Sequence, residues 1–432
     1  MYIDIIKKIK VKKFSVGVIG LGYVGLPLAI KFLSRNIKVF GVDNDKRKIF
    51  WLKKGISYIK SIKSNKILYF KRNKETISHD YSILSETDVI IICLPTPLKI
   101  NKVPDLSYIF NCLKELFPHL KKGQTLVLES TVYPGVTRKI KKILEKKFIL
   151  GENFYLGYSP ERENPGDKTF SYATTPKVIS GVTKRCLAVL DLVYSFIVKK
   201  VIKVKSVEIA ETSKLLENLY RAVNIGLVNE LKIICSILKI DVFEVINAAS
   251  TKNFGFQRFN PGPGLGGHCI PIDPYYLSWI SKRNGYDPKF IKTAGYINHY
   301  ITKWVVQNIL NNINKKKDFR ILILGISYKK NIDDDRESPA YDIMNMFLKK
   351  KISFDYNDPF FKRIRLGRKI NIKKKSISIN KENLKNFSAV LIVADHDQYN
   401  YKFISKHSEI VYDTRNVYKN KNLSKCNNIV FI

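Results

Sequence analysis

The sequence lacks any apolar run near the roughly 20 residues that a membrane-spanning helix needs. Its longest apolar runs, such as residues 89–94, have the length of a β-strand. The N-terminal segment 1–10 contains lysines but neither an apolar core nor a small-residue cleavage site, so it does not resemble a secretory signal. We therefore expect no membrane span and a cytoplasmic location.

Cysteine and histidine are scarce, with 6 of each in 432 residues. No two cysteines form a C-x-x-C pair, and no cluster of cysteine and histidine has the spacing of zinc ligands. In a chain of this length, so few cysteines do not make a disulfide framework. These absences predict a reduced protein without a structural metal.

Acidic residues are also few: 37 Asp and Glu stand against 76 Lys and Arg, a formal net charge of +39. Such an excess is typical of proteins that bind nucleic acid, anionic membranes or other polyanions. The basic residues are dispersed in short runs, however, and no RRM, zinc-finger or helix-turn-helix signature accompanies them. We interpret the charge as a lysine-rich solvated surface and expect no nucleic-acid partner. A non-catalytic basic protein that binds polyanions is the remote alternative.

The residues that are present favour an α/β fold. Apolar residues make up 45% of the chain, enough for two or three domains with their own cores. In residues 1–206, short apolar segments alternate with helical patterns, which is typical of parallel strands covered by helices on both faces. Residues 207–313 read mainly as helix, interrupted by a Pro/Gly-dense loop, and alternation returns in residues 314–432. We predict two Rossmann-like parallel-sheet domains joined by this central helical domain.

A glycine motif lies where the first predicted strand meets a predicted helix. Gly20, Gly22 and Gly25 form G-x-G-x-x-G, and Asp43 ends the next predicted strand. In this context the glycines let the backbone approach a pyrophosphate, and the aspartate accepts hydrogen bonds from a ribose diol. Asp43 would repel a 2′-phosphate and so favours NAD, although the basic residues 46–48 leave room for NADP. A glycine turn that serves packing alone is the other alternative.

A second unusual segment, residues 260–274, is dense in Pro and Gly and contains Cys269 and Asp273. Such a loop suits the close approach of a ligand, and Asp273 could hold a proton or a partner lysine. Together with NAD, a cysteine thiolate can capture an aldehyde as a thiohemiacetal, which is oxidised to a thioester and hydrolysed to an acid. The alternative is that Cys269 is only a small buried hydrophobe.

Lys214 and Asn218 lie one turn apart on a predicted long helix, so they share a face. A cation and an amide at this spacing could stabilise an oxyanion that develops on a substrate. By itself, such a pair is more often a solvated surface feature.

In their order and spacing, these motifs resemble those of the UDP-glucose/GDP-mannose dehydrogenase family over nearly the full chain. Further matching segments are 95–97, 130–137, 159–161, 210–218, 266–273 and 328–339. The resemblance implies an N-terminal NAD-binding Rossmann domain, a central helical domain that forms a homodimer, and a C-terminal Rossmann-like domain for a UDP-sugar. It also implies a metal-free oxidation of the sugar C6 alcohol to a carboxylate, with two NAD reduced per turnover.

The resemblance also implies roles for single residues. Cys269 matches the nucleophile, Lys214 and Asn218 match the oxyanion-binding pair, and Thr131 matches the residue that orients the catalytic water. Glu161 and Asp273 match residues that assist proton transfer. The cofactor-binding residues that it implies are Gly20, Gly22, Tyr23, Val24, Gly25, Asp43, Lys48, Thr96, Thr131 and Arg336. The substrate-binding residues that it implies are Glu161, Lys214, Asn218, Arg258, Phe259, Asn260, Pro261, Gly262, Gly266 and Lys329.

Two positions depart from the pattern of the UDP-glucose and GDP-mannose enzymes. Ile272 stands where those enzymes usually carry a Lys, and Pro165 stands where many relatives place a second Glu. Both changes resemble the N-acetylhexosamine branch, and residues 261–274 favour a 6-dehydrogenase acting on UDP-N-acetylglucosamine. The expected product is a uronic acid for surface polysaccharide such as O-antigen or lipopolysaccharide. UDP-N-acetylmannosamine, UDP-N-acetylgalactosamine and UDP-glucose are the alternative substrates.

Overall fold

The computed structural model describes residues 1–60, 62–99, 101–162, 174–267, 269–312, 318–364, 371–423 and 426–432. The chain forms two compact units, the first from Met1–Glu217 and Tyr275–Tyr286, and the second from Asn218–Pro274 and Asp287–Ile432. The division into three domains, with borders after residues 206 and 313, stays a prediction. Pro165 and the beginning of the predicted third domain, residues 314–317, lie outside the described residues.

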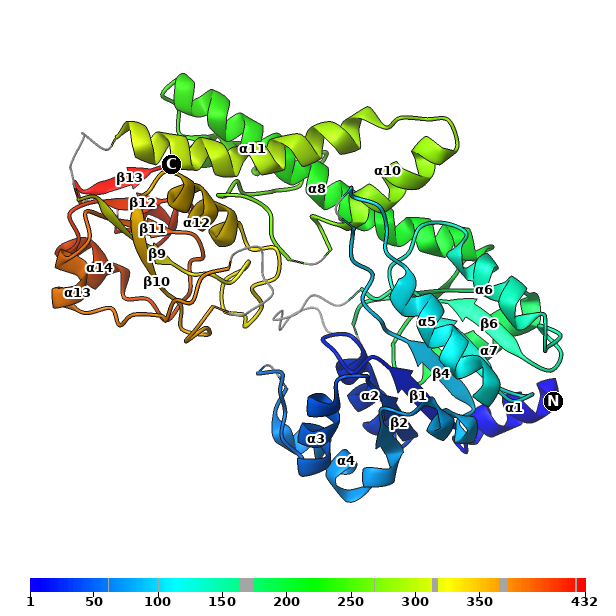
Figure 1. Ribbon diagram of the computed structural model, residues 1–432. Helices are drawn as coiled ribbons and strands as arrows, with labels where there is room; N and C mark the ends of the chain where they lie inside the picture. Colours follow the sequence, from blue (N-terminus) through cyan, green and yellow to red (C-terminus); the bar gives the residue numbers. More distant parts are fainter. Residues whose placement is uncertain are drawn as a thin grey trace. The chain divides into compact units, whose positions relative to one another are not determined.

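The first unit contains an eight-stranded sheet with the order β3-β2-β1-β4-β5-β6-β7-β8. Figure 1 shows this sheet with β1, β2, β4 and β6 labelled. Its strands are β1 (Ser15–Ile19), β2 (Lys38–Val42), β3 (Ile77–Ser78), β4 (Val89–Ile92), β5 (Thr125–Leu128), β6 (Tyr155–Tyr158), β7 (Lys177–Gly181) and β8 (Val201–Lys203). Neighbouring strands are parallel, as predicted, except β6 and β7, which are antiparallel. Both of these strands are almost fully buried, and a buried apolar run looks the same in either direction.

Helices cover this sheet and close its core. They are α1 (Tyr2–Lys10), α2 (Gly25–Leu33), α3 (Lys46–Lys54), α4 (Leu68–Arg72), α5 (Ser107–Leu116), α6 (Val136–Leu144) and α7 (Lys184–Ser195), with 3-10 turns at Ser64–Ile67, Lys74–Thr76, Tyr81–Glu86 and Phe117–His119. Helix α2 packs on β1 and β2, and α7 packs on β6, β7 and β8. Val16 and Val18 of β1 and Phe32 of α2 belong to the same buried cluster, which explains the continuous apolar character of the strand.

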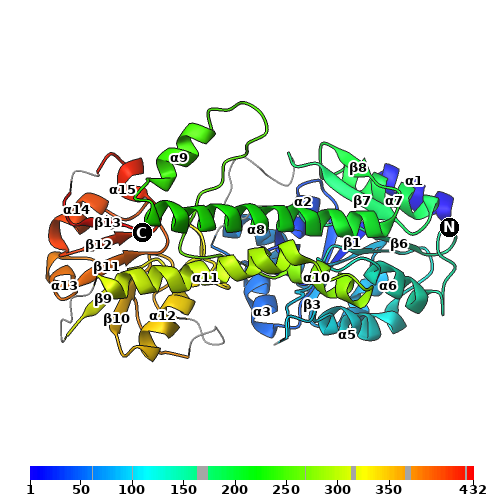
Figure 2. The same ribbon diagram turned by 90° about the horizontal axis from the view of Figure 1, so that it is seen from above.

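The predicted long helix is α8 (Val207–Ile237), which Figure 2 shows lengthwise. It is followed by α9 (Val242–Ala249), α10 (Asp273–Arg283) and α11 (Lys289–Asn311). The helical stretch after the Pro/Gly-dense loop is therefore broken at residues 284–288. Gly285 takes a left-handed φ of 88° there, and Pro288 forms the N-cap of α11. No helix in the described ranges is long and apolar enough to cross a membrane.

The second unit contains a five-stranded, fully parallel sheet with the order β10-β9-β11-β12-β13. Its strands are β9 (Arg320–Leu324), β10 (Ser353–Asn357), β11 (Ala389–Ile392), β12 (Val411–Asp413) and β13 (Ile429–Phe431). Its further helices are α12 (Pro339–Lys349), α13 (Lys381–Lys385), α14 (Tyr401–His407) and α15 (Val417–Asn420). Ile321 and Ile323 pack with Phe347 on one face, while Leu322 and Leu324 pack on the other. The predicted fold class, two parallel-sheet α/β regions with a central helical region, is confirmed.

Both sheets reverse their strand order beside their first strand. In the first sheet the reversal lies between β1 and β4, and in the second it lies between β9 and β11. In open α/β sheets, ligands bind outside the carboxyl ends of the strands at such a switch point. The segments that follow β1, β4, β9 and β11 are therefore candidate ligand-binding segments.

Candidate active site

The glycine loop after β1 meets the geometric needs of a dinucleotide site. Gly20 has a φ of 89°, and a Cβ atom on it would lie 2.5 Å from the Cys93 carbonyl oxygen. A Cβ on Gly25 would overlap the Gly20 carbonyl, so these two glycines are required by the protein's own backbone. A Cβ on Gly22 would meet nothing within 4 Å. The space beside Gly22 is thus open to a ligand, which fits the pyrophosphate of NAD at the start of α2.

Asp43 directly follows β2 and is buried. Its Oδ2 atom accepts hydrogen bonds from the backbone N–H of Leu21 and from Lys48 Nζ, each at 2.8 Å, and its Oδ1 accepts from the backbone N–H of Asp45 at 2.9 Å. The two residues predicted for the ribose side, Asp43 and Lys48, are therefore in direct contact. The predicted neighbours Tyr23 and Val24 also lie here: Val24 is the N-cap residue of α2, and Tyr23 packs against the core.

The other two residues predicted for the cofactor in this unit follow β4 and β5. Thr96 is buried, and its carbonyl accepts a hydrogen bond from the Tyr276 hydroxyl at 2.7 Å. Thr131 is half-buried and follows Ser130, whose Oγ accepts from the backbone N–H of Leu94 at 2.9 Å. The segments after these adjacent strands are thereby tied together at the carboxyl edge of the sheet.

Glu161, the predicted acid/base, lies just after β6 and is half-buried. Its Oε1 accepts from the backbone N–H of Arg162 at 2.7 Å, and its Oε2 lies 3.4 Å from Lys177 Nζ. The Arg162 guanidinium forms an ion pair of 2.8 Å with Glu217 of α8. Glu161 and the adjacent Arg162 therefore each form an ion pair with a residue of another element, Lys177 of β7 and Glu217 of α8.

Helix α8 buries the predicted oxyanion pair. Lys214 is 7% exposed and Asn218 is 0% exposed, so the alternative of a solvated surface pair is wrong. One turn earlier, the buried Glu211 carboxylate accepts from the backbone N–H groups of Gly135 and Thr137 at 2.6 and 2.8 Å, and so caps the start of α6. Burial, opposed by these bonds, raises the pKa of Glu211 to about 7. No motif singled out Glu211, although its spacing from Lys214 places both near the same helix face.

Cys269 is exposed, so the alternative role as a buried hydrophobe is wrong. Its carbonyl accepts from the backbone N–H groups of Ile272 and Asp273 at 3.2 and 2.8 Å, a turn that leads into α10. The Asp273 side chain is 1% exposed and accepts a hydrogen bond from the Asn218 amide. The Arg221 guanidinium donates to the carbonyl oxygen of that amide, which fixes its orientation. The structure thus brings Asn218, Asp273 and the cysteine turn together, with an amide as one partner of Asp273.

The glycines before Cys269 allow their loop to pack on the segment after β9. A Cβ on Gly266 would lie 2.5 Å from the Tyr328 Cβ, and one on Gly267 would meet the Tyr328 ring at 3.0 Å. The backbone N–H of Gly267 donates to the Arg336 carbonyl at 2.9 Å. The loop that carries Cys269 therefore lies against the segment that carries the predicted residues Lys329 and Arg336.

Arg336 is a half-buried guanidinium with a fixed partner. Its Nε and Nη2 atoms donate to the Asp334 carboxylate at 2.9 and 2.6 Å. Burial disfavours the charge of Arg336, but the hydrogen-bonded Asp334 outweighs it and raises the pKa of Arg336. Burial also raises the pKa of the neighbouring Tyr328 to about 12. At neutral pH this segment therefore presents an arginine cation and a neutral tyrosine.

The remaining predicted substrate residues form the beginning of the same loop. The exposed Arg258 donates from Nε to Asn260 Oδ1 at 3.1 Å, and Phe259 meets the Tyr220 ring edge-on. Pro261 and Gly262 are buried. A Cβ on Gly262 would lie 2.6 Å from Arg415 Nη1, and its N–H donates to Asn229 Oδ1 at 3.0 Å. Sequence reasoning missed Asn229 and Arg415, because each reaches the loop from a distant part of the chain.

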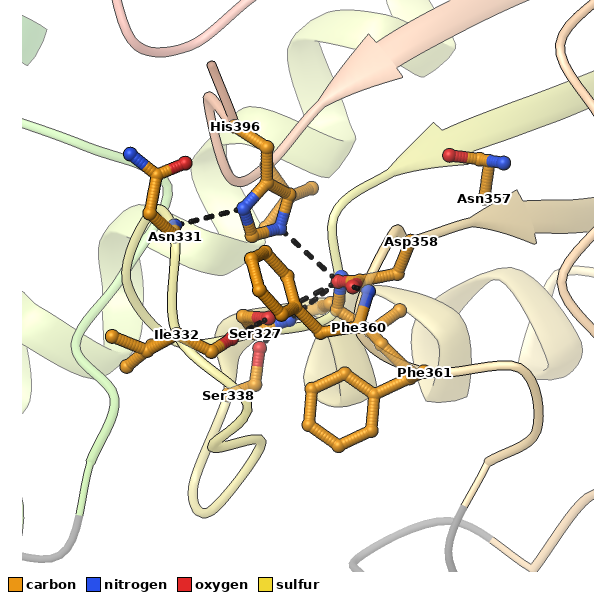
Figure 3. A network of polar contacts seen from close by, with 12 residues as sticks. Ser327, Asn331, Ile332, Ser338, Asn357, Asp358, Phe360, Phe361 and His396 are labelled. Atoms are coloured by element: carbon orange, nitrogen blue, oxygen red, sulfur yellow. Dashed lines mark hydrogen bonds and ion pairs between the residues drawn. The ribbon is translucent and has the colours of Figure 1, made fainter. Parts of the chain in front are cut away.

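A buried carboxylate fixes the turn after β9 (Figure 3). Asp358, just after β10, accepts from the backbone N–H groups of Ile326 and Ser327 at 2.7 and 3.0 Å. Burial opposes its charge, but the hydrogen bond from His396 and these backbone bonds lower the pKa of Asp358. The start of the turn that carries Lys329 is therefore held by an ionised side chain.

His396, after β11, fixes the other end of this turn. Its Nδ1 accepts from the backbone N–H of Asn331 at 2.9 Å, so its Nε2 carries the hydrogen that points to Asp358 Oδ2 at 3.2 Å (Figure 3). His396 is fully buried. Sequence reasoning missed both residues, although a polar residue just beyond an apolar strand of a parallel sheet is a usable signal.

Three domain models of one family match most of the chain. The NAD-binding domain of the UDP-glucose/GDP-mannose dehydrogenase family matches residues 14–198, its central domain matches 208–300, and its UDP-binding domain matches 322–420. Each model thus falls on one of the regions that carry the glycine loop, the cysteine loop or the second sheet.

Individual relatives agree with these domain matches. A UDP-N-acetyl-D-glucosamine 6-dehydrogenase from Salmonella typhi is 32% identical over 421 residues, covering 94% of this chain and 97% of the relative. One from Pseudomonas aeruginosa is 35% identical over 359 residues, covering 81% and 83%. The solved UDP-D-ManNAc dehydrogenase of Pyrococcus horikoshii has a TM-score of 0.85 at 27% identity, covering 96% of this chain and 98% of that one. The chain therefore belongs to the UDP-glucose/GDP-mannose dehydrogenase family and is an NAD-dependent nucleotide-sugar dehydrogenase with a UDP-binding domain.

Proposed function

We propose that the protein oxidises C6 of UDP-N-acetylglucosamine from the alcohol to the carboxylate. The observation that carries the chemistry is the exposed Cys269 on a turn whose neighbour Asp273 is hydrogen-bonded to the buried Asn218. The names of the two relatives with 32% and 35% identity support the sugar. The product would serve surface polysaccharide synthesis, such as O-antigen or lipopolysaccharide, from a cytoplasmic enzyme.

Gly20, Gly22, Gly25, Asp43 and Lys48 would hold the cofactor, with Thr96, Thr131 and Arg336 as further contacts. When bound, NAD accepts one hydride from the sugar C6 in each of the two oxidation steps. In the first step, a base or a water held by Thr131 removes the proton of the C6 hydroxyl, which leaves an aldehyde.

In the second step, the Cys269 sulfur adds to the aldehyde carbon and forms a thiohemiacetal. Lys214 and Asn218 donate hydrogen bonds to the oxygen on which negative charge develops, and oxidation of the adduct gives a thioester on Cys269. Water then attacks the thioester, Glu161 and Asp273 assist the proton transfers, and the free thiol and the carboxylate are released.

The central helix supports a homodimer. Leu216, Tyr220, Leu227 and Ile234 are exposed large side chains of α8 at spacings of four or seven residues, so they follow one face of the helix. An apolar stripe of this kind is typical of a surface that another helix covers. Light scattering of the purified protein tests the dimer, and Leu227→Glu should convert it to a monomer.

UDP-N-acetylmannosamine is the second candidate substrate, because the solved structure with a TM-score of 0.85 is a ManNAc dehydrogenase. The decisive experiment incubates the purified protein with NAD and each of four UDP-hexoses: the N-acetyl derivatives of glucosamine, mannosamine and galactosamine, and UDP-glucose. We expect the highest kcat/KM with UDP-N-acetylglucosamine and two NADH for each sugar consumed. A higher kcat/KM with another sugar would replace the proposed substrate, and no NADH from any of them would overturn the proposed function.

A further inference from the structure

Four polar side chains form a network at the carboxyl edge of the first sheet. Glu129 follows β5, Glu161 follows β6, Lys177 begins β7 and Tyr194 lies on α7. The exposed fractions of Glu129, Lys177 and Tyr194 are 1%, 3% and 0%. Burying charged groups costs free energy unless each has a partner of opposite charge. The ion pairs and hydrogen bonds of these four residues therefore show which side chain the network orients.

Lys177 lies between two carboxylates. Its Nζ is 3.0 Å from Glu129 Oε2 and 3.4 Å from Glu161 Oε2, and it lies 5.4 Å from the centre of the Tyr194 ring. The Tyr194 hydroxyl donates to the other oxygen of Glu129. Glu129 and Tyr194 thus anchor the ammonium from the core, while the half-buried Glu161 is its contact on the more exposed side.

The antiparallel direction of β7 creates this contact. In the β6–β7 ladder, Gly157 pairs with Gly181 and Tyr158 pairs with Ser180. Extending this register along both chains places Lys177 opposite residue 161. A parallel β7 would put its first residue at the other edge of the sheet, so the one antiparallel pair in this sheet is what delivers a lysine to Glu161.

Lys177 and the carboxylates of the network stabilise each other's charged forms. Burial favours the neutral form of Lys177, but Glu129 and Glu161 outweigh it and raise the pKa of Lys177. Burial raises the pKa of Glu129, and Lys177 opposes that rise. Cys93 also faces the two carboxylates, and burial raises the pKa of its thiol. Lys177 is therefore a permanent cation beside Glu161, and the fixed charge limits how that carboxylate can turn.

We propose that Lys177 is a positioning residue for Glu161: its ammonium, anchored by Glu129 and Tyr194, holds the Glu161 carboxylate in the orientation needed for proton transfer. The proposal rests on the proposed function, in which Glu161 assists the release of the product acid. It assigns a task in the reaction to three buried residues that touch neither the cysteine turn nor the glycine loop in any contact described above.

A double-mutant cycle tests this coupling. Lys177→Met should lower kcat about 10- to 100-fold, a part of the 10²–10⁴-fold that a positioned acid or base supplies, with both KM values unchanged within about twofold. In a Glu161→Gln background the same change should cost less than about twofold in kcat. An equal loss of kcat in both backgrounds would overturn the proposal, because Lys177 would then act on the fold and not through Glu161.

The conservative variant gives an independent readout. Lys177→Arg should retain most of the activity, because it keeps the charge. The matched control is Lys203→Met, which removes an exposed lysine that pairs with Asp191 of α7 at 3.0 Å and should leave kcat unchanged.

Lys177→Met leaves Glu129 without its cation and so endangers folding. The double variant Lys177→Met/Glu129→Gln removes both charges and keeps an acceptor for Tyr194. It should fold, as judged by circular dichroism, and should show the same low kcat; normal kcat in this folded variant would overturn the proposal. The variant Cys269→Ala distinguishes a failure of the proposed role of Lys177 from a failure of the proposed function. If it is inactive while Lys177→Met is fully active, only the role of Lys177 falls, whereas acid production by Cys269→Ala would overturn the proposed function itself.

Discussion

Replacement of His396 by Phe should loosen the turn that carries Lys329. The phenyl ring is larger than the imidazole but can keep its contacts with the rings of Phe360 and Tyr399, whose centroids lie 5.1 and 5.5 Å away. It removes two hydrogen bonds, one to the Asp358 carboxylate and one from the backbone N–H of Asn331. A bond to a charged group contributes about 1.5–3 kcal/mol and a neutral one about 0.5–1.5 kcal/mol. The variant should therefore lose about 2–4.5 kcal/mol of stability.

The assay combines stability with kinetics. Urea denaturation followed by circular dichroism should show the loss of stability, and amide hydrogen exchange should accelerate in residues 327–332. Since the turn carries Lys329, the KM for the UDP-sugar should rise about 3- to 10-fold, as expected for a loss of about 1 kcal/mol of binding, while the KM for NAD stays constant. His407→Phe, at a histidine on the outer helix α14, is the matched control. A His396→Phe protein as stable as the wild type within about 0.5 kcal/mol would refute the reasoning.

Four further predictions concern other parts of the molecule. The pKa of Glu211 is about 7 in the folded protein against an ordinary 4.5, so the free energy of unfolding should fall by about 3 kcal/mol as pH rises from 4.5 to 7. Glu211→Gln should flatten that part of the curve of stability against pH. Identical curves for the variant and the wild type would contradict this prediction. Gly25→Ala should lower stability through overlap with the backbone, whereas Gly22→Ala should fold normally and raise the KM for NAD about tenfold or more, and a normal KM would refute the open site at Gly22. Cys269→Ser should stall turnover at an aldehyde or covalent stage, which mass spectrometry of the mixture would detect; undiminished acid production would refute its role. Both ligands, NAD and the UDP-sugar, are anionic and the chain carries a charge of +39, so added salt should raise KM more than it lowers kcat. A KM that does not change with salt would show that the charge has no role in ligand capture.

Much of the fold could be predicted because its signals are local. The strands β2 and β5 lie in residues 1–206, where the sequence predicts buried strands, since apolar runs flanked by polar residues mark buried strands wherever they occur. The direction of β7 could not be predicted, because its buried pattern carries no sign of orientation. The break between α10 and α11 was missed although Gly285 and Pro288 mark it, since helical periodicity resumes soon afterwards.

The candidate site divides in the same way. Gly22 and Cys269 lie in short segments whose composition alone indicates a ligand, so the sequence is sufficient to predict them as site residues. The residues that hold the site in place pair across long stretches of chain: Glu129 meets Lys177 and Asp358 meets His396 at separations of 48 and 38 residues. No periodicity or motif connects such partners, because only the sheet topology brings the strand ends together.

The hydrogen bonds of Asp43 limit how the cofactor preference of this protein can be redesigned. The usual route to accept NADP is to remove the carboxylate that repels the 2′-phosphate. In this protein the Asp43 carboxylate also holds backbone. Its Oδ2 atom accepts from the N–H of Leu21 inside the glycine loop, and its Oδ1 atom accepts from the N–H of Asp45. A change at Asp43 would therefore disturb the pyrophosphate loop together with the ribose site. Asn has only one acceptor oxygen and would keep one of the two backbone hydrogen bonds, whereas Ala or Gly would lose both, so a switch to NADP in this chain also needs a compensating change in the glycine loop.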